Sequence, residues 1–204
     1  MRLVEVEFES AEVALPDGVT LLIAEARRLI ELMEDEFRAA IPAFVPSDFE
    51  AVYRALATIQ TARISTGQRF LEWGSGVGAV TCLAAVVGFD AVGIEIESPL
   101  VGMAEKLAKQ FDIAAQFVCG SFVPYGSEPL VDLAGEVAWL RTDAEDGYGE
   151  LELDPDDFDV IFAYPWPGEE QVIFDLFQQC AAVGTLLLTN HSQDGLRLQR
   201  KVRK

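Results

Sequence analysis

Residues Phe70 to Ala79 read FLEWGSGVGA. Residues 69–73 are typical of a short buried strand, three alternate glycines then predict a tight loop, and residues 77–87 predict a helix of small side chains. Glycine is needed in such a loop because the backbone turns sharply and because a Cβ would hold a ligand away from the main-chain N–H groups. The stretch therefore predicts half of a nucleotide-binding βαβ unit.

Two acidic residues narrow the choice of ligand. Glu72 lies two positions before Gly74, the first glycine, and Glu95 closes the next expected strand, residues 91–95. A carboxylate at the first place repels a diphosphate but attracts an amino group, and one at the second place suits both hydroxyls of a ribose. The pattern predicts a ligand with a ribose and a cationic amine, and S-adenosylmethionine fits that description.

With these residues in place, the segment from Gln68 to Asn190 resembles the cofactor half of class I S-adenosylmethionine-dependent methyltransferases. The resemblance implies an α/β fold: a doubly wound, mostly parallel Rossmann-like sheet with helices on both faces. It also implies a cofactor site in the glycine loop and after the second and third strands, made of Glu72, Gly74, Ser75, Gly76, Gly78, Glu95, Ile96, Gly120, Ser121 and Phe122.

One position departs from the family pattern. The third strand of these enzymes usually ends in an acidic residue that binds the adenine amino group, and here Ser121 stands in that place. We expect the Ser121 hydroxyl to bind the adenine and Phe122 to pack on it. Residues 95–101, EIESPLV, are also similar to a segment of protein-lysine methyltransferases related to those that act on ATP synthase c-subunits.

Length and composition favour one α/β domain with a small extension. The chain has 204 residues, half of them hydrophobic. We expect residues 1–66 to form an N-terminal strand and helical extension, and residues 67–204 to form the cofactor-binding domain.

Charge and cysteine usage exclude several classes of function. A net charge of −19 opposes nucleic acid as a partner and suits a basic protein or a neutral or cationic small molecule, although solubility alone is the commonest reason for such a charge. Cys82, Cys119 and Cys180 lie far apart in apolar segments, which favours buried thiols in a reducing compartment such as the cytoplasm. No C-x-x-C is present and His191 is the only histidine, so neither a metal site nor a histidine triad is predicted. No signal peptide or membrane span is expected.

The N-terminal extension contains a strand and two helices by its pattern. Apolar and acidic residues alternate over 4–8, which predicts a strand that adds to the sheet edge, pairs with residues 11–15, or meets its copy in a homodimer. A turn at 16–18, a helix over 21–40 and a second helix capped by Ser47 and Glu50 follow. Phe44, Phe49 and Tyr53 are candidates for a lid over the cofactor, although apolar helix stripes are usually core.

An insertion at residues 123–157 separates the third and fourth strands. It predicts a helix over 130–140 and a strongly acidic remainder, either a solvated loop or a docking surface for a basic partner.

An aromatic loop follows the fourth strand, residues 158–163. Ligands bind at the carboxyl ends of strands in a doubly wound sheet, so Tyr164, Pro165, Trp166 and Glu169 are the predicted substrate-binding residues. Amino methyltransferases carry Asn or Asp, two prolines and an aromatic residue here, and this chain departs from that pattern. The Tyr164 hydroxyl can accept a hydrogen bond from an amine, and Trp166 can hold an alkylammonium group. A rigid structural turn is the alternative.

The last third predicts a helix over 169–182, a strand over 185–189 with His191 just past it, and a basic tail over 196–204. The tail predicts at most a short strand, so we expect a shortened C-terminus in place of the usual final pair of strands.

These patterns predict a methyltransferase that acts on a small-molecule or protein acceptor, with amines among the candidates. Methyl transfer needs little acid–base machinery, because the sulfonium is already an activated donor. No catalytic residue is predicted. A non-catalytic binding or assembly protein with this fold is the first alternative. An NAD-dependent oxidoreductase is the second, although the chain has no Tyr-x-x-x-Lys pair.

Overall fold

The computed structural model describes residues 1–8, 14–37, 47–133, 140, 144–166, 168–191 and 195–203. Its strands are β1 (Arg2–Glu5), β2 (Arg69–Trp73), β3 (Asp90–Glu95), β4 (Ala115–Cys119), β5 (Val160–Ala163), β6 (Leu186–His191) and β7 (Gly195–Val202). Its helices are α1 (Asp17–Phe37), α2 (Phe49–Thr61), α3 (Ala79–Val86), α4 (Ser98–Gln110), α5 (Glu128–Leu133), α6 (Gly147–Leu151), the 3₁₀ turn η1 (Pro155–Asp157) and α7 (Glu170–Cys180).

The described strands form one seven-stranded sheet in the order β1-β7-β6-β5-β2-β3-β4. Strands β4, β3, β2, β5 and β6 are parallel, and β7 runs antiparallel to both of its neighbours. The chain builds outward from β2 to β4 and then returns to place β5 on the other side of β2. This reversal creates a switch point between β2 and β5, where ligands bind in open α/β sheets.

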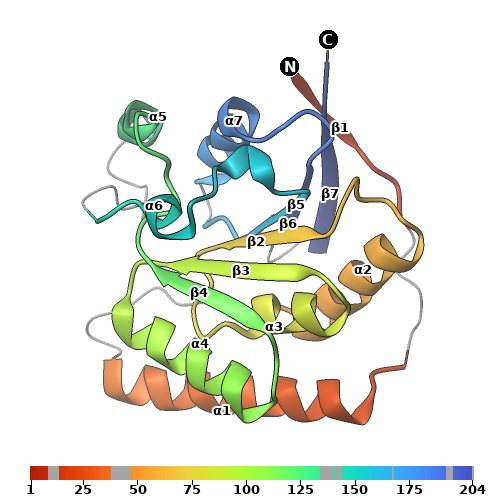
Figure 1. The fold of residues 1–204 in the computed structure, drawn as a ribbon, viewed down its shortest axis with the longest axis vertical. Helices are drawn as coiled ribbons and strands as arrows, with labels where there is room; N and C mark the ends of the chain where they lie inside the picture. Colours follow the sequence, from red (N-terminus) through yellow and green to blue (C-terminus); the bar gives the residue numbers. More distant parts are fainter. Residues whose placement is uncertain are drawn as a thin grey trace.

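Helices cover both faces of the sheet (Figure 1). One apolar cluster packs the helices α1, α2, α3 and α4 against one face of the sheet. A second cluster, which includes Trp73 and Phe158, packs α7 against the other face. The strand interiors are buried on both faces, which explains their continuous apolar sequences. The predicted doubly wound α/β architecture is confirmed.

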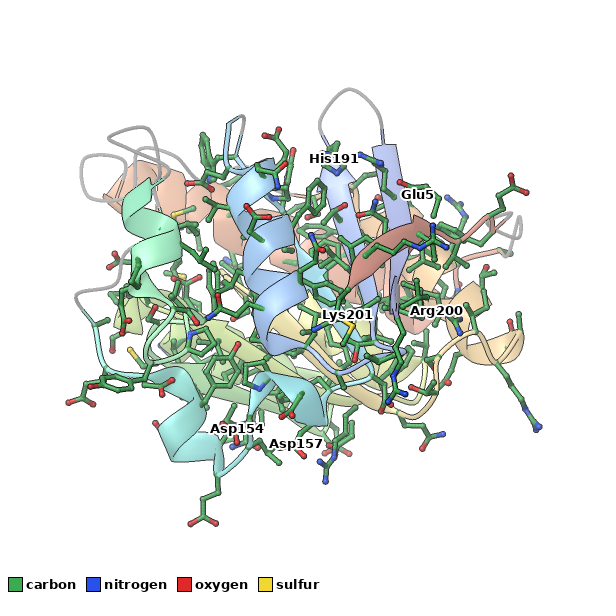
Figure 2. The ribbon with its side chains drawn as sticks, turned by 90° about the horizontal axis from the view of Figure 1, so that it is seen from above. Glu5, Asp154, Asp157, His191, Arg200 and Lys201 are labelled. Atoms are coloured by element: carbon green, nitrogen blue, oxygen red, sulfur yellow. The ribbon has the colours of Figure 1, made fainter. Side chains whose placement is uncertain are left out.

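The two ends of the chain meet at the edge of the sheet. Strand β1 pairs with β7 in an antiparallel register that places Val4 opposite Arg200, and Figure 2 shows Glu5 and Arg200 on these neighbouring strands. Glu5 accepts hydrogen bonds from Arg197 and from Gln199. The addition of β1 to the sheet edge is thus the arrangement found among the three foreseen. The basic tail forms a strand of eight residues, longer than expected, because β1 covers its outer side.

The starts of two helices differ from the sequence prediction. Helix α1 begins at Asp17, within the predicted turn, because an acidic residue after Pro16 suits the free N–H groups of a helix start. The N-cap of α2 is Asp48 in place of Ser47; its carboxylate accepts a hydrogen bond from the Ala51 N–H at 3.0 Å. Glu50 pairs with Arg27 on α1 at 2.7 Å and so does not complete the predicted capping box.

The insertion contains more structure than its acidic composition indicated. The described part of the predicted helix is α5, which begins at Glu128, and α6 and η1 were not predicted. Phe44, Pro167 and parts of the predicted helices over 21–40 and 130–140 lie outside the described residues. Among the described helices, none has the length and apolar character that crossing a membrane requires.

Candidate functional site

The glycine loop between β2 and α3 is built from left-handed backbone. Gly74, Gly76 and Gly78 have φ angles of +76°, +53° and +79°, which side chains with a Cβ rarely adopt. A Cβ on Gly78 would also lie 2.6 Å from the Cβ of Ala104. The N–H of Gly74 donates to the carbonyl of Ile94 at 2.9 Å. This hydrogen bond holds the loop to the end of β3, and the lack of a side chain at Gly78 lets the loop pack closely against α4.

Glu72 lies in β2 directly below this loop and is buried. Its Oε2 atom accepts two hydrogen bonds from Thr81 in the first turn of α3, from the N–H at 2.8 Å and from the hydroxyl at 2.5 Å. Burial raises the pKa of Glu72 to about 8, against the opposing effect of the hydrogen bonds from Thr81.

Glu95 ends β3 and ties the loop to that strand. Its carboxylate accepts the Gly76 N–H at 2.8 Å and the Glu97 N–H at 3.0 Å. Burial raises the pKa of Glu95, while these backbone N–H groups stabilise its ionised form. The ion pairs found among the described residues involve neither Glu95 nor Glu72. Two buried carboxylates without a cationic partner suit a ligand that carries positive charge and hydroxyl donors.

A small cavity of about 50 Å³ lies beside the loop. Five predicted residues line it: Glu72, Gly74, Ser75, Gly76 and Tyr164. The other lining residues are Ser47, Phe49, Val77, Ala79, Val80 and Phe162. The buried Ser75 hydroxyl has no hydrogen-bond partner within the described structure, so a polar ligand in this cavity would satisfy it.

Phe162 and Phe49 are aromatic residues that line the cavity and that were not among the predicted binding residues. Phe162 pairs with Glu72 across β5 and β2. It stands two residues before Tyr164, so the period-two alternation of β5 could have identified it. Phe49, one of the lid candidates, lines the cavity at the start of α2, whereas Tyr53 belongs to the apolar core.

The residues expected around the adenine lie beyond the cavity lining. A Cβ on Gly120 would lie 2.8 Å from the Glu145 carbonyl oxygen, so glycine allows the insertion to pack on the end of β4. The Ser121 hydroxyl accepts the Val123 N–H at 3.1 Å. The Phe122 ring stacks on Trp73 with centroids 5.3 Å apart, against the apolar cluster on the α7 side of the sheet. Contact of Phe122 with an adenine stays a prediction.

Of Ile96 and the predicted substrate residues in the aromatic loop, only Tyr164 lies in the described cavity lining. Ile96 follows Glu95, and its carbonyl accepts the Cys119 thiol at 3.7 Å. Pro165 is buried, and Trp166 forms a closed turn with Glu169: the Trp166 N–H donates to the Glu169 carboxylate at 3.3 Å, and the Glu169 N–H donates to the Trp166 carbonyl at 2.9 Å. Within the described lining, Tyr164 is the one predicted substrate residue that reaches the cavity.

His191 and the acidic residues around η1 are not part of the described cavity lining. His191 is the last residue of β6, and its Nε2 lies 2.9 Å from the Thr189 hydroxyl. Asp154, Asp156 and Asp157 have carboxylates within 4.8 Å of one another, all exposed. Asp157 accepts the Asp154 N–H at 2.9 Å, so these acids cap η1.

The fold was compared with known proteins. No protein-family model and no curated protein matches the chain. A methyltransferase from Geobacter sulfurreducens matches with a TM-score of 0.56 and 12% identity, over 94% of this chain and 93% of that one. An O-methyltransferase from Bacillus cereus in complex with SAH (S-adenosylhomocysteine) gives 0.52 and 14%, over 88% and 68%. An RNA methyltransferase from Salinibacter ruber in complex with S-adenosyl-L-homocysteine gives 0.51 and 21%, over 77% and 92%.

The chain has the fold of these methyltransferases. The class I architecture inferred from the glycine loop and Glu95 is therefore confirmed at the level of the fold. The similarity of residues 95–101 to protein-lysine methyltransferases stays a prediction.

Proposed function

We propose that this protein is an S-adenosylmethionine-dependent methyltransferase. The observation that carries the proposal is the pair of buried carboxylates, Glu72 and Glu95, that lack a cationic partner among the described residues and lie on either side of a left-handed glycine loop. Glu72 would receive the ligand's ammonium group, and Glu95 would accept hydrogen bonds from the ribose hydroxyls. A carboxylate offers about four acceptor positions, so Glu95 keeps capacity beyond the backbone N–H groups of Gly76, Ile96 and Glu97.

The donor set of the loop fits this ligand. The left-handed backbone at Gly74, Gly76 and Gly78 permits close approach, and the partnerless Ser75 hydroxyl supplies a further polar group. Ile96, Gly120, Ser121 and Phe122 would border the adenine. When bound, S-adenosylmethionine supplies a methyl group already activated by its sulfonium. The chain's task is then to orient an acceptor and to exclude water.

The aromatic side of the cavity supports a neutral or cationic acceptor. Tyr164, Phe162 and Phe49 form this side, and Glu72 is the one charged side chain in the described lining. A small molecule or a basic protein segment, with amines among the candidates, fits this lining. The net charge of −19 disfavours RNA, the substrate class named for the Salinibacter protein. Pro165, Trp166 and Glu169 would support Tyr164 from the turn behind it.

A non-catalytic binding or assembly protein is the second candidate function. The size of the cavity favours it: about 50 Å³ is far below the roughly 300 to 1,000 Å³ of ordinary small-molecule pockets. Cofactor binding without turnover on any acceptor would support this second function.

The cellular setting is also a proposal. All three cysteines are free thiols, which supports a reducing compartment such as the cytoplasm. Cys82 is buried as expected, but Cys180 is half-buried and Cys119 is exposed. A homodimer stays open, because the outer edge of β1 has no strand partner within the described sheet.

Calorimetric titration with S-adenosylmethionine and, separately, with NAD tests the proposal on the wild type and on Glu95→Ala. We expect S-adenosylmethionine alone to bind, and the substitution to weaken binding at least about tenfold, because hydrogen bonds to a charged group are worth about 1.5–3 kcal/mol each. Absence of binding to a demonstrably folded protein would contradict the proposal, and binding of NAD would favour the oxidoreductase alternative.

A further inference from the structure

Thr81 holds one oxygen of the Glu72 carboxylate with two hydrogen bonds. The backbone N–H and the hydroxyl of Thr81 both donate to Oε2, at 2.8 and 2.5 Å. Thr81 is fully buried. Among the described residues, no hydrogen bond reaches the other oxygen, Oε1, and Glu72 lines the cavity. One oxygen is therefore fixed by the protein, and the second is available to a ligand.

The hydrogen bond from the Thr81 hydroxyl to Glu72 is not needed to cap helix α3. Thr81 is the third residue of α3, and its N–H is one of the groups that a helix start leaves without an internal partner. Glu72 satisfies that N–H from β2, as a capping side chain would. The Thr81 hydroxyl, however, needs no acceptor from Glu72 to cap the helix, since threonine hydroxyls commonly donate to a carbonyl one turn earlier.

Space for this hydroxyl is provided by Gly93 on the neighbouring strand. A Cβ at Gly93 would lie 2.7 Å from the Thr81 hydroxyl and 2.6 Å from the Ser75 Cβ. Two elements besides α3 therefore contribute to the placement of Thr81 beneath the loop: β2 supplies the acceptor, and β3 leaves the room.

The groups around Glu72 would otherwise favour its neutral form. Its titratable neighbours are Glu95 on β3, Cys82 on α3 and Tyr164 after β5. None of these is cationic at neutral pH. Burial raises the pKa of Glu72 to about 8, and the two hydrogen bonds from Thr81 are the main opposing effect.

We propose that Thr81 is a positioning residue for the methyl-donor site: its hydroxyl stabilises the ionised form of the Glu72 carboxylate and orients it so that Oε1 receives the donor's ammonium group. This inference rests on the proposed function. It assigns to Thr81 a role in ligand affinity and in its dependence on pH, in addition to a role in packing.

The test measures the affinity for S-adenosylhomocysteine between pH 6 and 9 in the wild type, Thr81→Val and Thr81→Ser. Valine keeps the volume and the N–H but removes the hydroxyl, and serine keeps the hydroxyl. We expect wild-type affinity to rise with pH up to about 8, where Glu72 loses its proton. Valine should weaken binding about tenfold near pH 7 and shift the midpoint upward by about one unit, as the loss of one charge-assisted hydrogen bond predicts. Serine should restore most of the affinity.

Thr185→Val is the matched control. Thr185 is buried, its hydroxyl donates to the Phe158 carbonyl at 3.0 Å, and it lies at the opposite end of the strands, before β6. It should keep the wild-type profile. Because the ligand's own ionisation is the same for every variant, differences between variants report on Glu72.

Two results would overturn the inference. The first is a Thr81→Val variant that binds with the affinity and the pH midpoint of the wild type. The second is a loss of affinity that is the same at every pH and that Thr81→Ser shares. If the folded wild type binds no S-adenosylhomocysteine at any pH, the proposed function itself fails, and this inference fails with it.

Discussion

Glu72 combines burial, a neighbouring acid and the absence of a cationic partner among the described side chains. Taking a carboxylate out of water costs several kcal/mol unless hydrogen bonds or a counter-charge compensate. The two hydrogen bonds from Thr81 compensate for this cost in part. The cost of burial that remains raises the pKa of Glu72 to about 8. Such an uncompensated acid lowers stability but favours binding of a cation, which is a common compromise at functional sites.

The free energy of unfolding should reveal this acid directly. The pKa of Glu72 rises from 4.5 to about 8 on folding, so between these values the folded state retains a proton that the unfolded state has lost. Stability therefore falls with rising pH across this window, by up to about 1.4 kcal/mol per unit. In Glu72→Gln this contribution should vanish, so the variant gains stability relative to the wild type from pH 5 to 8.

Urea unfolding at several pH values measures the difference. Glu105→Gln, an exposed position on α4, is the control for loss of a negative charge. Parallel curves for Glu72→Gln and the wild type would contradict the raised pKa.

At the scale of single elements, the unit from β2 to α3 could be predicted because local sterics dictate it. Glycine adopts φ angles such as those at Gly74 and Gly78 far more readily than residues with a Cβ, so the alternate glycines indicate a tight loop between a strand and a helix. Glu72 and Glu95 were predicted as site residues from their places near strand ends, and their contacts with a ligand stay predictions. The orientation of Phe122 could not be predicted, because it depends on stacking against Trp73, which is distant in sequence. Helix α6 was missed because its five residues carry too few apolar positions for a periodic signal.

Gly93 in β3 leaves the room that the glycine loop and α3 need, and Gly93→Ala tests this packing. In Gly93→Ala the new Cβ would lie 2.6 Å from the Ser75 Cβ, so loop and helix must shift. We expect a loss of about 1–3 kcal/mol in the free energy of unfolding, typical of overpacking, together with weaker S-adenosylmethionine binding. Gly102→Ala in α4 is the matched control: nothing lies within 4 Å of its Cβ, and alanine in a helix interior should add about 0.5–1 kcal/mol. Urea unfolding of both variants decides; equal stabilities would refute the crowding at Gly93.

At the scale of the whole molecule, the sheet is completed by residues from opposite ends of the chain. Strand β7 would be an edge strand with unpaired N–H and C=O groups if β1 did not cover it, and such edges promote aggregation. Side-chain hydrogen bonds also link the two strands: Glu5 on β1 accepts hydrogen bonds from Arg197 and Gln199 on β7. The sequence predicted both strands, but it left their pairing open because local pattern does not specify a partner so far away. Strand β1 therefore belongs to the same sheet as the strands of residues 69–202.

Proline substitutions in β1 test this closure. Val4 lies opposite Arg200, and the N–H of Val6 donates to the Leu198 carbonyl at 2.8 Å, so the period-two pattern directs the Val4 N–H toward β7 as well. Val4→Pro removes that donor and should cost about 1–3 kcal/mol of unfolding free energy. Leu3→Pro removes an N–H that this pattern directs away from β7, where proline is tolerated on edge strands, and should cost less. Light scattering should show more self-association for Val4→Pro than for Leu3→Pro, because the β7 edge is exposed more often. Equal losses of stability and equal scattering in the two variants would show that β1 does not close the sheet in this register.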